Sequence, residues 1–150
     1  DDRNISRLVR RVRQRNWIPA IGRHCLHQPV YVGDVVEAIL ACPDAPAARG
    51  QTYAIAGARP LTWDALIHTV GDIVGQRPRQ LPVPAAAVAG LLSALEATGL
   101  RLPIQAEQVR RMLEDKAYDI EPARRDLHFA PQTFAAAMRQ IYGDPEALRT

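Results

Sequence analysis

The sequence lacks the residue patterns that carry the commonest enzyme chemistries. Its nine glycines form no Gly-rich loop after an opening strand, so no helix N-terminus is prepared to hold a pyrophosphate. Its only two serines are Ser6 and Ser93, and neither lies in the Gly-flanked turn of a hydrolase nucleophile. We therefore expect no catalytic residue and no cofactor-binding residue in this chain by itself.

Cysteine and lysine are also scarce. Cys25 and Cys42 are the only cysteines, and their spacing fits neither a metal site nor a disulfide framework, which favours a reducing compartment and hence the cytoplasm. Lys116 is the single lysine, so arginine supplies almost all of the positive charge. The net charge of +3 is too small to indicate a nucleic-acid or membrane partner.

No apolar run reaches the length of a membrane span. The best candidate, Val83 to Leu95, is too short and is interrupted by Pro84, Gly90 and Ser93. A hydrophobic content of 47% over 150 residues is nevertheless enough to bury the core of one domain. We expect a single domain, residues 1–150, without a membrane span.

Apolar residues at helical spacing predict helices in the first half of the chain. One runs from Asn4, its expected N-cap, to Gln14. A second is expected to have Asp34 as its N-cap, and a third has Thr62 as its cap and Gly75 as its stop. The stripe expected to be buried in the second helix is Val35, Val36, Ile39 and Leu40.

Short β-like runs lie between these helices, and further helices follow. The predicted strands are Trp17 to Ile21, Val30 to Val32 and Thr52 to Ala56, and Gln80 to Pro84 is an extended stretch. The later helices are predicted from Val88 to Gly99, from Gln105 to Ala117 and from Thr133 to Gly143. The resulting fold class is α+β and mainly helical, with five or six helices on a few short strands that form no complete doubly wound sheet.

Two groups of side chains invite a metal or acid–base interpretation. Cys25 and His27 share a face if their segment is extended, but two ligands fall short of a tetrahedral set, so we expect no metal site. Asp115 and Asp119 lie four residues apart, and helix termination with surface solvation explains them without chemistry.

Four segments resemble, in order, the extended short-chain dehydrogenase/reductases of the NAD(P)-dependent epimerase/dehydratase family. They are Gln28 to Ala38, Gly50 to Gly57, Leu61 to Leu66, and Lys116 to Phe134. The chain is most similar to the atypical branch that contains the NADPH-binding accessory subunit of respiratory complex I. The resemblance implies the C-terminal, substrate-side part of such a protein, with an incomplete Rossmann sheet.

The resemblance also implies what this chain does not contain. The family's dinucleotide-binding half, with its Gly-rich loop and catalytic Tyr and Lys, would precede Asp1. No tyrosine here is followed by lysine four residues later, which is the family's acid–base pair. NAD or NADP is thus implied for the full-length protein only.

The resemblance carries over four substrate-binding candidates. Asn4 matches the position at which an Asn opens the helix that lines the family's substrate pocket, although a plain N-cap, which needs no ligand, is the favoured interpretation. His27, Gln28 and Tyr31 are the polar groups nearest the cleft, with strand edges and surface as their alternative role. Members that act on nucleotide-sugars usually carry Arg where His27 stands, which is a departure from their pattern.

Three functions compete at this point. The first is the substrate-binding part of a nucleotide-sugar epimerase or dehydratase-like oxidoreductase, taking a small-molecule substrate. The alternative is a non-catalytic structural or assembly protein, as in the complex I relative. A nucleic-acid binder using the Arg-rich first helix is the least supported, because that helix lacks interleaved aromatic residues.

Self-association is a further expectation. In the family, the segments Val30 to Val32 and Thr52 to Ala56 contact the nucleotide-binding half. Without that half, strand edges and apolar surface are open, and identical chains are the nearest partners. We expect a homodimer through these strands or through the apolar face of Val88 to Leu95.

Overall fold

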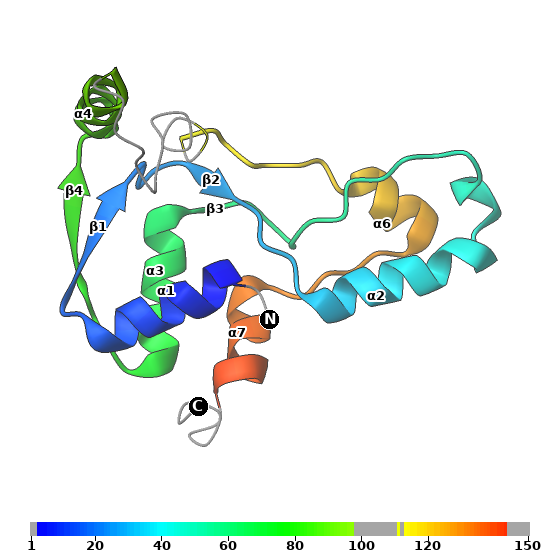
Figure 1. Ribbon diagram of the computed structural model, residues 1–150. Helices are drawn as coiled ribbons and strands as arrows, with labels where there is room; N and C mark the ends of the chain where they lie inside the picture. Colours follow the sequence, from blue (N-terminus) through cyan, green and yellow to red (C-terminus); the bar gives the residue numbers. More distant parts are fainter. Residues whose placement is uncertain (1–2, 98–110, 112, 144–150) are drawn as a thin grey trace. The chain divides into compact units, whose positions relative to one another are not determined.

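The structure is a computed structural model that describes residues 3–97, 111 and 113–143 (Figure 1). The chain divides into two compact units. The first unit comprises Asp1–Leu26 and Thr62–Asp115, and the second comprises His27–Leu61 and Lys116–Thr150. Each unit is therefore built from two separate stretches of sequence.

Helices α1 and α3 form the core of the first unit. The elements of this unit are α1 (Arg3–Gln14), β1 (Trp17–Ile21), α3 (Trp63–Val74), β4 (Arg79–Val83) and α4 (Ala85–Ala97). Helix α1 packs against α3, and each contributes three buried apolar residues at helical spacing. These are Leu8, Val9 and Val12 from α1, and Leu66, Ile67 and Val70 from α3.

Strands β1 and β4 form a parallel pair with one outward face. Their register runs from Trp17 opposite Arg79 to Ile21 opposite Val83. Ile18 is buried, whereas Trp17 is exposed, as expected for side chains that alternate between the two faces of a sheet. A second two-stranded sheet pairs β2 (Leu26–His27) with β3 (Leu61–Thr62).

The second unit is helical around a small apolar cluster. Its elements are α2 (Val32–Ala41), the 3-10 turns η1 (Cys42–Asp44) and η2 (Pro46–Ala48), and helices α6 (Glu121–Leu127) and α7 (Phe134–Tyr142). The cluster consists of buried residues from α2, from the segment after η2, and from the region of α6. They are Ala38, Ala56, Ile120, Ala123, Leu127 and Phe129.

Several local predictions are confirmed. The first helix and the strand Trp17–Ile21 form where they were expected. The Thr62 side chain accepts a hydrogen bond from the Ala65 N–H at 3.1 Å, and Gly75 ends α3 with a left-handed φ of 69°. The Thr133 side chain likewise caps α7 through the Ala136 N–H at 3.2 Å. The α+β, mainly helical class is confirmed, and within the described ranges each sheet has two strands.

The prediction for α2 is wrong in both its cap and its buried face. The helix begins at Val32, so Asp34 lies inside its first turn, and Tyr31 takes the cap position without a side-chain bond. Asp34 and Ala38 are buried, whereas Ile39 and Leu40 on the expected inner stripe are 62% and 67% exposed. The physical reason is the Asp34 carboxylate, which accepts hydrogen bonds from Gln132 in the same unit. These bonds turn the Asp34 side of the helix inward.

The predicted strands Val30 to Val32 and Thr52 to Ala56 do not form. Val32 starts α2, and the residues from Gln51 to Gly57 make no strand ladder. Their apolar side chains pack on the core cluster instead, with Ala56 fully inside it. The β-branched and aromatic residues that pack on this cluster are therefore explained by the burial of their side chains, and the backbones of the two segments do not pair as strands.

Two further expectations need correction. Asn4 lies within α1, because the helix already includes Arg3. Gly99, the predicted end of the helix that starts at Val88, lies outside the described residues. The same holds for residues 105–110 and 112 of the predicted helix Gln105 to Ala117. Leu113 to Ala117 are not helical. The Leu113 carbonyl there accepts from the Cys25 thiol at 3.2 Å. Among the described residues, no helix is long and apolar enough to cross a membrane.

Candidate functional site

Gln28 connects three segments of the second unit. Its side chain is buried, its Nε2 donates to the Gly57 carbonyl at 2.8 Å, and its Oε1 accepts from the Tyr118 N–H at 2.7 Å. A Cβ at Gly57 would collide with the carbonyl oxygen of Pro29, so this close backbone approach requires glycine. Both the nitrogen and the oxygen of the Gln28 amide thus stabilise the fold of this unit.

Asp34 makes the second long-range connection. Its carboxylate accepts from the Gln132 backbone N–H at 3.1 Å and faces the Gln132 Nε2 at 3.4 Å. These residues are 98 positions apart in the chain. Burying the carboxylate is tolerated because it has these hydrogen-bond donors and lies in the first turn of α2, where the helix dipole favours negative charge.

A third connection joins Tyr53 to α6. The Tyr53 hydroxyl donates to Asp126 at 2.9 Å, and Asp126 also accepts from the Arg125 side chain at 2.7 and 3.1 Å. The bonds from Arg125 and then from Tyr53 lower the pKa of Asp126. Desolvation and the bond to Asp126 raise the pKa of Tyr53. The hydroxyl is therefore held protonated, as a donor.

The predicted substrate-binding residues fall in both units. Asn4 is exposed on the first turn of α1 in the first unit. His27, Gln28 and Tyr31 lie in the second unit, on the stretch that leads into α2, and Gln28 alone among them is buried. The Tyr31 ring lies so close to Gly33 that a Cβ there would meet it. The substrate roles of these four residues stay predictions.

Cys25, considered for a metal site, is instead engaged within the first unit. Its thiol donates to the Leu113 carbonyl, and the neighbouring Leu26 N–H donates to Asp115 at 2.8 Å. Desolvation and the nearby Asp115 charge raise the pKa of the Cys25 thiol. A thiol that resists ionisation is a poor nucleophile and a poor metal ligand.

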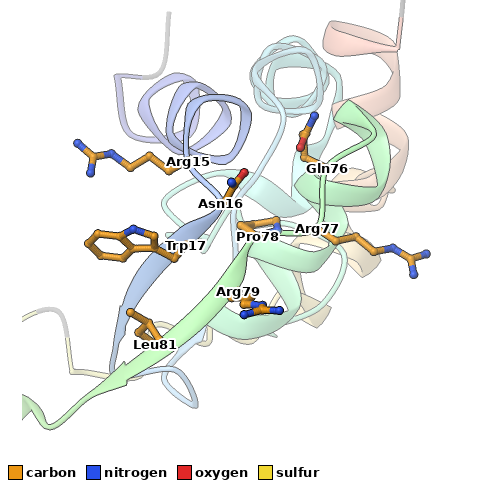
Figure 2. Close-up of a pocket in the computed structure, with 8 residues that line it drawn as sticks. All are labelled: Arg15, Asn16, Trp17, Gln76, Arg77, Pro78, Arg79 and Leu81. Atoms are coloured by element: carbon orange, nitrogen blue, oxygen red, sulfur yellow. The ribbon is translucent and has the colours of Figure 1, made fainter.

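The first unit carries a pocket that sequence reasoning missed (Figure 2). Its volume is about 530 Å³, and it opens beside the amino-terminal ends of β1 and β4. Its lining residues are Arg15, Asn16, Trp17, Gln76, Arg77, Pro78, Arg79 and Leu81. The available signal was the alternation in Trp17–Ile21, which places Trp17 on the face opposite the buried Ile18.

Comparison with known proteins gives a fold likeness and no family. No family model and no curated protein matches the chain. The solved structure described as "Crystal structure of gox2253" is similar over 92% of this chain, with a TM-score of 0.68 and 14% sequence identity. That likeness concerns the fold alone. The chain spans 44% of the length of that structure.

Proposed function

We propose that this chain is the substrate-binding portion of an NAD(P)-dependent epimerase/dehydratase-like oxidoreductase of the cytoplasm, without catalytic activity of its own. The observation that carries the proposal is how the resembling segments meet. Gln28 bonds to Gly57 and Tyr118, which lie in the second and the fourth of those segments. Asp34 and Tyr53 make further bonds into the fourth segment. Residues that carry the resemblance are thus the ones that hold the second unit together.

An uncovered face of α2 supports the same proposal. Val32, Val36, Ile39 and Leu40 are between 48% and 69% exposed, and their spacing of i, i+4, i+7 and i+8 places them on one side of the helix. A continuous apolar stripe on a helix is normally covered by another part of a protein. In the proposal, a dinucleotide-binding portion that holds NAD or NADP covers this α2 stripe.

The proposed substrate is a small molecule of the nucleotide-sugar class. His27 occupies the place where the family's nucleotide-sugar enzymes usually carry Arg, whose planar guanidinium binds phosphate oxygens in pairs. Tyr31 supplies a neutral polar group, and Gln28 contributes by fixing the segment between His27 and Tyr31. Asn4 lies in the first unit and is carried over from the resemblance alone. The His27 imidazole offers a diphosphate fewer hydrogen-bond donors than the guanidinium of Arg does.

The test is a gain of binding. Calorimetric titration of the chain with UDP-glucose is expected to give weak affinity that rises roughly tenfold in His27→Arg, as for a new charge-assisted hydrogen bond. His24→Arg is the matched control, since it adds the same charge to an exposed position three residues away, and it is expected to change affinity less than twofold.

Two results would contradict the proposal. One is an equal response of His24→Arg and His27→Arg, which would mean nonspecific attraction of the diphosphate. The other is micromolar affinity of the unaltered chain for NAD(H) or NADP(H) that exceeds its affinity for ADP, because no phosphate-cradling loop is present to hold the rest of a dinucleotide.

A further inference from the structure

The pocket beside the amino-terminal ends of β1 and β4 combines an open aromatic ring with arginines. Trp17 and Arg79 are register partners at the start of the parallel strand pair, and both side chains are exposed. The Arg15 guanidinium lies over the Trp17 ring, 5.9 Å from its centroid. Figure 2 shows Arg15 and Trp17 along one side of the pocket and Gln76 and Arg77 along the other.

Three arginines, Arg15, Arg77 and Arg79, line this pocket. In the part of the chain that the structure describes, no carboxylate lies within ion-pair distance of Arg15, Arg77 or Arg79. The preceding helix adds to the field, since the stretch from Arg3 to Arg15 holds six arginines and no acidic residue. A concave surface lined by one sign of charge concentrates ions of the opposite sign.

The exposed ring of Trp17 favours a ligand with an apolar, flat group, which an inorganic anion does not have. Trp17 is 47% exposed, although burying an indole is strongly favourable, so a flat apolar surface is left open at the arginines. Nucleobases of any sequence stack favourably on an exposed aromatic ring. The ligand that satisfies both features carries an aromatic ring and a phosphate.

We propose that this pocket binds a free nucleoside phosphate, with the base stacked on Trp17 and the phosphate oxygens accepting hydrogen bonds from Arg15 and Arg79. A volume of about 530 Å³ suits one small ligand. A nucleic-acid groove uses a row of aromatic side chains, whereas Trp17 and the half-buried Trp63 are the only aromatic residues in the sequence of the first unit. The proposal uses none of the residues proposed above for the substrate.

The test follows the indole N–H resonance of Trp17 in the unaltered chain during titration with ADP. A saturable shift is expected, and Arg15→Gln and Arg79→Gln are each expected to weaken ADP binding roughly tenfold, as for loss of a charge-assisted hydrogen bond. Arg7→Gln, which changes an exposed arginine on α1 outside the pocket, is the matched control and is expected to change affinity less than twofold. Circular dichroism verifies that each variant is folded.

Titrations with other ligands test whether the pocket requires both a base and a phosphate. Adenosine and inorganic phosphate are each expected to bind at least tenfold more weakly than ADP, because each satisfies one half of the pocket. No shift with millimolar ADP would overturn the proposal. The proposal would also be overturned if an oligothymidylate bound more tightly than ADP and if Arg7→Gln weakened that binding as much as Arg79→Gln. Such a result would identify a nucleic-acid surface spread along α1.

Discussion

At the scale of single residues, Gln28 has the most consequential contacts in the second unit. Its amide satisfies one backbone carbonyl and one backbone N–H that come from distant parts of the chain. Gln28→Ala is expected to destabilise the protein by about 2–4 kcal/mol, because the buried Gly57 carbonyl and the partly buried Tyr118 N–H lose their partners. Urea denaturation measures the loss. Gln76→Ala, at an exposed pocket position, serves as the control and is expected to cost less than about 0.5 kcal/mol.

Asp126 gives a residue-scale prediction about pH. The bonds from Arg125 and Tyr53 hold the pKa of its carboxyl below the ordinary value of about 3.9. The ionised carboxylate is thus favoured by folding, so its stabilising contribution is present above that value and is lost as pH falls through the lower folded pKa. Asp126→Asn is expected to flatten the acid side of the stability curve, measured by urea midpoints from pH 5 to pH 2.

The control for this prediction is Asp72→Asn, which removes an exposed carboxylate from α3 of the other unit. It is expected to leave the acid slope close to that of the unaltered chain. An Asp126→Asn variant with the unaltered slope would show that the Arg125 and Tyr53 bonds do not couple folding to the proton.

At the scale of elements, two glycines have opposite roles. Gly57 lies where the backbone of Pro29 leaves no space for a Cβ, whereas Gly90 lies within α4 with nothing near its Cβ position. Gly57→Ala is expected to destabilise by more than about 2 kcal/mol through overpacking against backbone. Gly90→Ala is expected to stabilise by up to about 1 kcal/mol, because alanine favours a helix. Thermal unfolding of both variants, compared in one buffer, checks the opposite signs.

Element boundaries show what the sequence alone predicts well. Thr62, Gly75 and Thr133 were predicted correctly because capping depends on residues three or four positions away. The inward face of α2 was predicted wrongly because it depends on Gln132, almost 100 residues later in the chain. The spacing of Val, Ile and Leu in the helix does not indicate that a carboxylate is buried in their place. The pocket was missed for the same reason, since it needs β1 and β4 paired.

At the scale of the whole molecule, the α2 stripe should determine how the isolated chain associates. The strand edges expected to mediate pairing are absent from the described structure, but Val36, Ile39 and Leu40 form an open apolar surface on α2. Exposed apolar stripes recruit partners, and a stripe that meets its own copy forms a two-fold dimer. We propose that the chain forms a homodimer through this stripe when no other polypeptide covers it.

Light scattering at high micromolar concentration tests this association with a matched pair of substitutions. Ile39→Lys places a charge in the middle of the stripe and is expected to give a monomer, whereas Leu91→Lys makes the same change on the exposed side of α4 and is expected to leave the dimer intact. Both positions are more than 60% exposed, so neither change is expected to cost more than about 0.5 kcal/mol of stability. A dimer broken only by Leu91→Lys would move the contact to α4, and a strictly monomeric unaltered chain would contradict self-association through either helix.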